Sequence, residues 1–300
     1  MTNAKDWLLA KSTNIKQTDQ AMFDGYARAG IKADEVSCAH LGDSNTEGAV
    51  DWKLVRRQAD AAGVMLWSVH LPFAPFETVN PASPDAAVRK KTVEIMREYM
   101  AGASSIGIDK AVIHPSGEPN PDAERAERMK YAAEILAILA DVGSEYGMTV
   151  CVEDIPRTCL GNCAADFKYL LADSDKLRVC FDTNHMLIEK NVDFVRALGD
   201  KIVTLHVSDY DFRNERHWLP FEGKNDWASI VSALEAVDYK GPWLYEVGLE
   251  TPGTYIRPDL TYEDFAENYA ACIEKRVGLV RGMPNEEVCA AHSYFAVPQI

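Results

Sequence analysis

Side chains that can bind metal ions or move protons recur where apolar stretches of this chain end. The stretch VCFDTNH (179–185) begins with apolar residues typical of a buried strand and continues to Asp182 and His185. Other apolar runs end in the same way, at His40, His70, His114, Glu153, His206 and Glu246. Six of the seven histidines lie at such an end or in the loop that follows. A scattered placement would not produce this pattern, which therefore predicts one shared site.

The carboxylates indicate what this site holds. A carboxylate that ends a buried strand must be paired, be solvated or bind a cation. Glu153, Asp182 and Glu246 would bring three negative charges to one pocket, with Arg157 and Arg216 as the nearby cations. One divalent metal ion is the most economical solution to this crowding.

The predicted metal ligands are Glu153, Asp182, His206 and Glu246. Carboxylate oxygens with one imidazole suit Mn²⁺, Co²⁺, Zn²⁺ or Mg²⁺, and the ligand types do not choose among these ions. Each residue alone also has a structural explanation, since a single histidine at a strand end is more often a hydrogen-bonded structural residue. That explanation weakens when it must be applied to every strand end together.

The elements that position these residues form a repeat of short β-type runs and amphipathic helical patterns. The strand candidates are 7–12, 34–40, 66–73, 110–117, 149–156, 178–185, 202–209 and 243–250. Eight such units predict an α/β fold, a (β/α)₈ TIM barrel, whose active site lies at the carboxyl ends of the strands. A doubly wound open sheet is the alternative, but the chain has no glycine-rich phosphate-binding turn. We expect one catalytic domain over residues 1–276 and a short C-terminal extension, 277–300, packed on the barrel or on a neighbouring subunit.

Local signals at two helix starts support the helical assignments. Ser83 followed by Pro84 predicts an N-cap and a proline at the first helical position, and Thr261 with Asp264 predicts a capping box.

Composition limits the function classes. The net charge of −15 disfavours nucleic acid as a partner over most of the surface. No run approaches the roughly 18 apolar residues of a membrane span, so no membrane association is expected. The seven cysteines are an odd number in a chain too large to depend on disulfides, which favours reduced thiols and a cytoplasmic location.

At these strand ends the sequence resembles the xylose isomerase-like TIM-barrel superfamily. This superfamily includes sugar phosphate isomerases and epimerases, inosose dehydratases and endonuclease IV. The likeness rests on VHLPF, VIHPSG, VEDIP, CFDTNH, LHVSD, ERHWLPFEGKNDW and YEVG, which occur in the family order between residues 70 and 246. One departure is Phe221, which stands where the sugar-enzyme loop usually has glycine.

The resemblance implies a role for each matched residue. Glu153, Asp182, His206 and Glu246 match the shared metal ligands, and the two glutamates also match the catalytic pair that flanks the substrate carbon. The implied substrate-binding residues are His70, His114, His185, Arg216 and His217. Endonuclease IV has three zinc ions, and its extra ligand positions correspond to His70, His114, His185, His217 and Glu215, where the nuclease has aspartate. Glu215 is therefore a possible additional metal ligand.

The function expected from these features is a divalent-metal-dependent isomerase or epimerase of a small-molecule sugar or sugar phosphate. It would act by proton transfer through a metal-bound enediolate, as an aldose–ketose isomerase or a ketose 3-epimerase. The alternatives are an inosose-dehydratase-like lyase, a metal-dependent phosphodiesterase related to endonuclease IV, and, last, a sugar-binding barrel without turnover. An apolar tail and an acidic surface are compatible with a homodimer or homotetramer.

Overall fold

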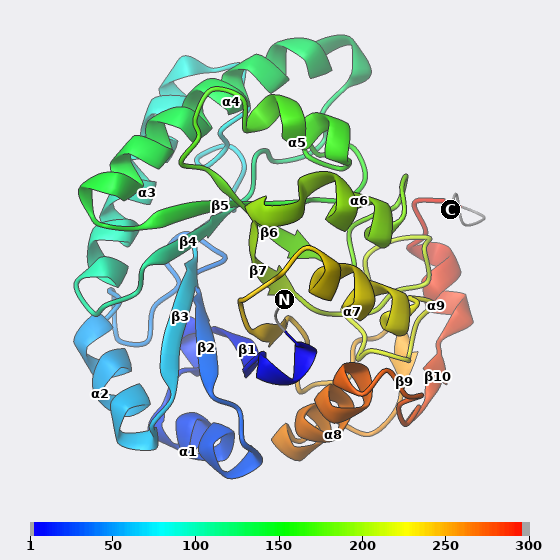
Figure 1. The fold of residues 1–300 in the computed structure, drawn as a ribbon. Coiled ribbons are helices and arrows are strands. Elements are labelled where there is room, and N and C mark those ends of the chain that lie inside the picture. Colours follow the sequence, from blue (N-terminus) through cyan, green and yellow to red (C-terminus); the bar gives the residue numbers. More distant parts are fainter. Residues whose placement is uncertain (1–2, 296–300) are drawn as a thin grey trace.

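A computed structural model describes residues 3–295 and shows eight parallel strands surrounded by helices (Figure 1). The strands begin within two residues of the predicted positions, and all but the first end three to five residues earlier than predicted. They are β1 (Leu9–Asn14), β2 (Ala33–Ser37), β3 (Met65–His70), β4 (Lys110–Ile113), β5 (Thr149–Glu153), β6 (Arg178–Asp182), β7 (Ile202–His206) and β8 (Trp243–Tyr245).

Helices follow the strands along the chain and cover the outside of the sheet (Figure 1). They are α1 (Gln20–Ala29), α2 (Trp52–Ala62), α3 (Ala86–Ser104), α4 (Asp122–Glu145), α5 (Ala164–Leu170), α6 (Asn191–Leu198), α7 (Trp227–Ala236) and α8 (Tyr262–Ile273). Short 3₁₀ helices are η1 (Ala4–Asp6), η2 (Ile15–Gln17) and η3 (Gly199–Lys201).

The strands form a nearly closed barrel, which confirms the predicted fold. Their order is β7-β6-β5-β4-β3-β2-β1-β8, and every pairing within this sheet is parallel. The two end strands meet just beyond β7, where the Val207 N–H donates to the Leu244 carbonyl at 2.8 Å and the Glu246 N–H to the Val207 carbonyl at 3.1 Å. All eight strand ends therefore open on the same mouth of the barrel.

The lower barrel interior is filled by small and apolar side chains, so it is a packed core. Ala10, Ala33 and Leu244 form one group, with Trp67 against it. A second group is formed by Val112, Cys151 and Cys180. Alternation along each strand then directs the next inward residues into the mouth.

Two predicted helix starts have different outcomes. Thr261 and Asp264 form the predicted capping box at the start of α8. The prediction at Ser83 is wrong, because α3 begins at Ala86 and its cap is Asp85, whose carboxylate accepts from the Ala87 N–H at 2.8 Å. Asp85 is the better-placed acceptor for the first free N–H groups of this helix.

The C-terminal extension contains two further elements, β10 (Met283–Pro284) and α9 (Glu286–Ala291). β10 pairs with β9 (Tyr255–Ile256), and Cys289 of α9 is buried with Trp218 and Tyr255. The extension was predicted to span 277–300, and residues 296–300 lie outside the described part of the chain.

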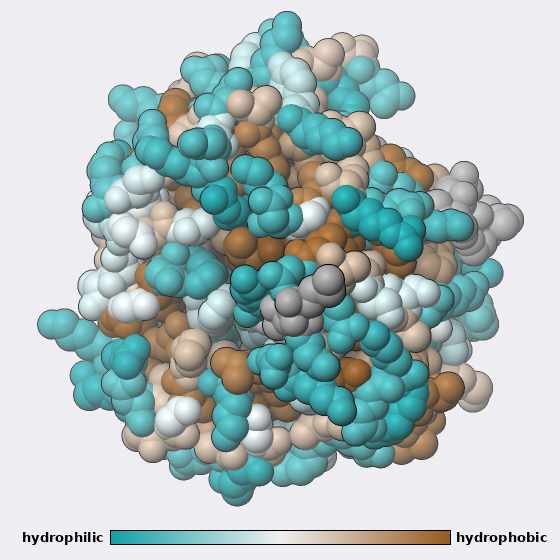
Figure 2. Space-filling model, in the orientation of Figure 1, coloured by the Kyte–Doolittle hydropathy of each residue, from teal (hydrophilic) through white to brown (hydrophobic). Residues whose placement is uncertain are grey.

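The face shown in Figure 2 is mostly hydrophilic, with apolar residues in small groups between polar ones. Within residues 3–295, no helix has the length and apolar character needed to cross a membrane.

Candidate metal centre and active site

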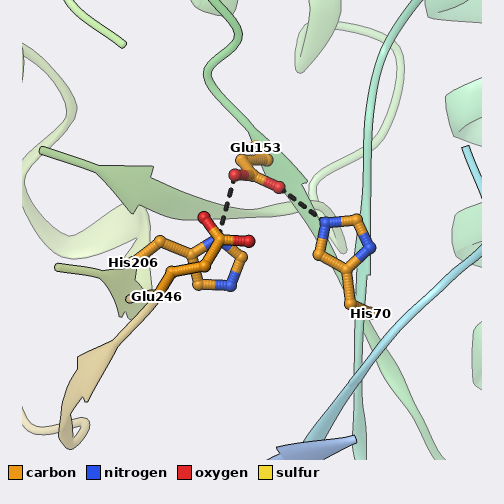
Figure 3. Close-up of side chains that lie close together, drawn as sticks. All are labelled: His70, Glu153, His206 and Glu246. Carbon is orange, nitrogen blue, oxygen red and sulfur yellow. Dashed lines mark hydrogen bonds and ion pairs between the residues drawn. The ribbon is translucent and has the colours of Figure 1, made fainter. Parts of the chain in front are cut away.

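Glu153, the last residue of β5, is the centre of the candidate site (Figure 3). Its side chain is buried, and each carboxylate oxygen contacts imidazole nitrogen. Oε1 lies 2.8 Å from His206 Nδ1, and Oε2 lies 3.0 Å from His70 Nε2 and 3.2 Å from His114 Nε2. Three strand ends are thus tied to one carboxylate.

Glu246 and Asp182 each direct a free oxygen toward the same region. Glu246 Oε2 lies 3.6 Å from His206 Nδ1 and 3.6 Å from His217 Nδ1, and Asp182 Oδ2 lies 3.4 Å from His185 Nδ1. Both oxygens are buried and accept no hydrogen bond. A buried carboxylate oxygen without a donor is costly unless a cation balances it.

The pKa values of the acids in this cluster are shifted by burial and by the charges close to them. Burial, and then the carboxylates of Glu246 and Glu153, raise the pKa of Asp182 well above its usual value, against the opposing charge of His185. Burial also opposes ionisation of Glu153, but the imidazoles of His206 and His114 outweigh it and hold the pKa of Glu153 well below its usual value.

These residues fit a divalent ion. One atom from each of His70, Glu153, His206 and Glu246 lies within 4.8 Å of the others, and the same holds for Glu153, Asp182 and His185. Carboxylate oxygen with imidazole nitrogen is the donor set of several divalent metals. Three of the four predicted ligands, Glu153, His206 and Glu246, thus fall in one group with His70. The fourth, Asp182, falls in neighbouring groups, with Glu153 and His185 and with His217 and Glu246.

A second group of possible ligands lies next to the first. His185, Glu215 and His217 also have donor atoms within 4.8 Å of one another. His185 connects the two groups, since its Nε2 lies 3.3 Å from Glu215 Oε2 while its Nδ1 lies near Asp182. Glu215 thus lies in a group whose donor atoms could hold a metal ion.

A cavity of about 180 Å³ opens onto both groups. It is lined by Phe73, Phe76, His114, Ser116, Glu118, Glu153, Ile155, Arg157, Cys159, His185, Glu215, His217 and Glu246. Arg157 is the one arginine or lysine in this lining, and its guanidinium is already paired with Glu118 at 2.5 Å and with Glu215 at 2.7 Å.

A larger groove, of about 780 Å³, lies between α6 and α7. Among residues 3–295, none of the acid and histidine groups that could hold a metal ion lies in this groove. The chemistry therefore belongs to the smaller cavity.

His40, His70 and Arg216 are among the positions singled out in the sequence that do not line the cavity. His70 is buried beside it, against Glu153. His40 is exposed and lies 3.8 Å from Asp43. Arg216, expected to contact substrate, is buried instead against Asp211 at 2.9 Å, and it also donates to the Cys289 carbonyl at 3.0 Å. Its guanidinium fastens the C-terminal extension to the loop after β7.

Sequence reasoning missed Glu35, in the middle of β2. This carboxylate is completely buried and lies 2.8 Å from His206 Nε2. A signal was present, because a glutamate inside an apolar strand must find a partner in the barrel.

Phe221, which departs from the glycine usual in the sugar-enzyme loop, has a backbone conformation that glycine would adopt more easily. Phe221 has a φ of +77°, in the left-handed region that favours glycine. Its N–H donates to Asp209 Oδ2 at 2.9 Å, and its ring packs near Trp227. These contacts hold a conformation that phenylalanine rarely adopts alone.

Comparisons with known proteins agree with this geometry. The family model described as "Xylose isomerase-like TIM barrel" matches residues 23–271. An uncharacterised protein of Methanocaldococcus jannaschii is 27% identical over 177 residues, covering 56% of this chain and 60% of that protein. A D-psicose 3-epimerase of Agrobacterium fabrum is 26% identical over 240 residues, covering 76% of this chain and 78% of the epimerase.

A nuclease is also among the relatives. A probable endonuclease 4 of Carboxydothermus hydrogenoformans is 25% identical over 215 residues, covering 64% of this chain and 71% of the relative. Among solved structures, an L-ribulose 3-epimerase superimposes with a TM-score of 0.70 at 20% identity, covering 89% of this chain and 94% of that one. With the family model spanning most of the barrel, this chain belongs to the xylose isomerase-like TIM-barrel family.

Proposed function

We propose that this protein is a divalent-metal-dependent ketose 3-epimerase, or a closely related sugar isomerase, that moves the proton next to the sugar carbonyl. The observation that carries the proposal is the pair Glu153 and Glu246, which face one small cavity and share His206 as a neighbour. The similarity to proteins named as 3-epimerases supports this reaction class.

The metal would be held by Glu153, Asp182, His206 and Glu246. A divalent ion there would polarise the sugar carbonyl and make the neighbouring C–H more acidic. The orphaned oxygens of Asp182 and Glu246 support this ligand set.

The two glutamates have different roles in the proposal. Glu246 is assigned as the base that removes the proton, since one of its two carboxylate oxygens would bind the metal and the other would take the proton. Loss of this proton gives an enediolate. Glu153 is assigned to return a proton to the opposite face of the carbon, which inverts the stereocentre. Because its pKa is held low, Glu153 must first receive that proton from a neighbouring imidazolium such as that of His70, whose Nε2 lies 3.0 Å from Glu153 Oε2.

The substrate is assigned as an unphosphorylated sugar. A phosphate group needs free cationic or N–H donors. Arg157 is the one arginine or lysine lining the cavity, and its charged partners Glu118 and Glu215 are both carboxylates. The lining imidazoles of His114, His185 and His217 also face carboxylates. Phe73 and Phe76 supply apolar walls beside these polar groups, a mixture that suits a sugar ring or chain.

The test is proton exchange in D₂O. The protein is loaded in turn with Mn²⁺, Co²⁺, Mg²⁺ or Zn²⁺ and incubated with free ketopentoses and ketohexoses and with their phosphate esters. Deuterium should enter the carbon next to the carbonyl of a free ketose, detected by NMR and mass spectrometry. Glu246→Gln is the matched control and should stop this exchange. Absence of exchange with every sugar would remove the proton-transfer function.

The same experiment separates epimerisation from dehydration. A lyase shares the first proton abstraction but then expels a β-hydroxyl, which gives an ultraviolet-absorbing enone or diketone. An epimerase gives a second ketose with no such absorbance.

A metal-dependent phosphodiesterase is the second candidate. The group His185, Glu215 and His217 favours it, because this group provides ligands for a further ion beside Glu153 and Asp182. The likeness to a probable endonuclease 4 points the same way. Metal analysis and cleavage of a duplex with an abasic site would test it: tightly held zinc ions in the second group together with cleavage would favour the nuclease over the epimerase.

A further inference from the structure

Glu35 has an unusual position for a carboxylate. It lies in the middle of β2, is completely buried and points into the barrel. Both of its oxygens are engaged: Oε1 lies 2.8 Å from His206 Nε2, and Oε2 accepts from the Ser68 hydroxyl at 2.7 Å. β2 and β7 are not neighbours in the sheet, so the side chain crosses the barrel interior to reach His206.

This contact divides the two nitrogens of His206. Nε2 faces Glu35, while Nδ1 lies 2.8 Å from Glu153 Oε1 and 3.6 Å from Glu246 Oε2. A neutral imidazole carries one N–H and one lone pair. Both nitrogens thus face a carboxylate, but only Glu153 belongs with His206 to a group that could hold a metal ion. With a metal ion in that group, the carboxylate of Glu35 would keep the N–H on Nε2 and leave the lone pair of Nδ1 for the metal.

We propose that Glu35 is a positioning residue that fixes the tautomer and the ring orientation of His206, so that Nδ1 is the nitrogen presented to the metal. The proposal rests on the metal-dependent function argued above. Carboxylate–histidine–metal arrangements of this kind typically change metal affinity by about 10- to 100-fold when the carboxylate is lost.

Simple packing does not explain this residue. A buried carboxylate costs free energy that an apolar side chain of similar size would not. The interior below it is filled by alanine, leucine and cysteine, so the barrel closes without acids at that level. Glu35 occurs at the level of His206, and its contacts are confined to donors that orient it.

The experiment measures metal affinity. Wild type, Glu35→Gln and Glu35→Asp are freed of metal by chelation, and the dissociation constants of Mn²⁺ and Co²⁺ are measured by calorimetry. The visible spectrum of each protein saturated with Co²⁺ reports the ligand geometry. Gln removes the charge, and Asp keeps the charge but retracts it by one methylene, beyond hydrogen-bond reach of Nε2.

The matched control is Asp34→Asn. Asp34 is also buried in β2, but alternation turns its side chain to the opposite face, where its charge acts on Lys11. Circular dichroism and thermal unfolding of the chelated proteins identify any variant that has not folded. If Glu35→Gln does not fold, Glu35→Asp decides the question.

The expected result is an affinity loss of about 10- to 100-fold in Glu35→Gln, a smaller loss in Glu35→Asp and a changed Co²⁺ spectrum in both, with Asp34→Asn close to wild type. Glu35 variants that bind Co²⁺ and Mn²⁺ as wild type does, with the same spectrum, overturn the assignment and leave the proposed function intact. A wild-type chain that takes up none of these ions contradicts the proposed function itself.

Discussion

Glu153 and Glu246 face the same cavity, but their carboxylates have different surroundings. Glu153 is buried and contacts His70, His114 and His206, whereas Glu246 is partly exposed and its Oε2 accepts no hydrogen bond. A residue that holds three imidazoles contributes to the architecture of the site. In the proposed function, Glu246 is the base that removes the proton, and Glu153 both organises the site and returns the proton.

The variants Glu246→Gln and Glu153→Gln should therefore fail in different ways. Glu246→Gln should lower the rate of solvent-deuterium exchange by at least about 100-fold and leave the free energy of unfolding nearly unchanged. Glu153→Gln should also lower the free energy of unfolding by roughly 3 kcal/mol, because the buried imidazoles lose their anionic partner. Urea unfolding and the exchange assay, run on both proteins, check the contrast. Equal stability losses would contradict the division of roles.

Lys11 predicts a pH dependence of stability. Burial lowers its pKa from 10.5 to about 8, against the opposing charge of Asp34. Below this pKa the lysine is charged in the folded and unfolded chain alike, and burying the charge costs free energy. Above it, the folded lysine loses its proton while the unfolded lysine keeps it until its ordinary pKa, so the unfolded chain binds more protons and stability rises with pH.

The size of this effect is set by the pKa shift of Lys11. A shift from 10.5 to about 8 corresponds to about 3 kcal/mol. Lys11→Met removes the titration and serves as the reference. Relative to this variant, the wild-type protein should gain roughly 2–3 kcal/mol in free energy of unfolding when the pH is raised from about 7 to about 10. A difference that stays constant over this range contradicts a buried, perturbed lysine.

At the scale of elements, Arg157 joins three loops at the mouth. It lies in the loop after β5 with a φ of +58°, and it pairs with Glu118 after β4 and with Asn214 and Glu215 after β7. The pairs fix the wall of the cavity without touching Glu246. They therefore act on binding more than on proton transfer.

Arg157→Met should raise the KM for the ketose by about 10-fold and change kcat by less than about 3-fold. Removing the guanidinium frees both carboxylates and lets the loops separate. Arg97→Met is the matched control, since Arg97 pairs with Glu145 on the exposed surface between α3 and α4. Steady-state kinetics on the two variants give the answer, and a loss confined to kcat would show that Arg157 acts on the reaction itself.

The sequence predicted the strands and their polar ends well, because both signals are local. A buried parallel strand is a short apolar run, and Glu153, Asp182 and His206 each follow or end one directly. Glu35 was not predicted, since it lies inside its strand and its role depends on His206, 171 positions away.

Arg216 is a second residue whose contacts the sequence did not predict. It lies in the matched loop between Glu215 and His217, so its type and place favoured a contact with substrate. In the structure, its guanidinium donates to Asp211 and to the carbonyls of Cys289 in α9 and of His292 just after it. These two carbonyls lie 73 and 76 positions further along the chain. Which way a loop side chain turns is decided by such distant acceptors, and no local pattern contains them.

At the scale of the whole molecule, the C-terminal extension and the candidate site are connected through Arg216. Its side chain binds Asp211 and the carbonyls of Cys289 and His292, while its N–H donates to Asn184 Oδ1 at 2.9 Å. Arg216 thus joins α9, the loop after β6 and the loop that holds the second group of ligands. The extension should therefore support both the stability of the barrel and the shape of the cavity.

A double-mutant cycle tests this connection. Ending the chain after Gly282 removes β10 and α9, and Arg216→Met removes the guanidinium. Each change should lower the free energy of unfolding by about 2–4 kcal/mol. Arg216→Met breaks a buried charge network, and the truncation removes carbonyls that accept hydrogen bonds from this arginine. Since the truncated chain has already lost the Cys289 and His292 carbonyls, Arg216→Met should cost less there, with an interaction energy of about 1–2 kcal/mol. Urea unfolding of the four proteins measures this energy. Strict additivity would mean that the extension stabilises the barrel through Trp218 and Tyr255 packing alone, and that the loop with Glu215 and His217 keeps its place without it.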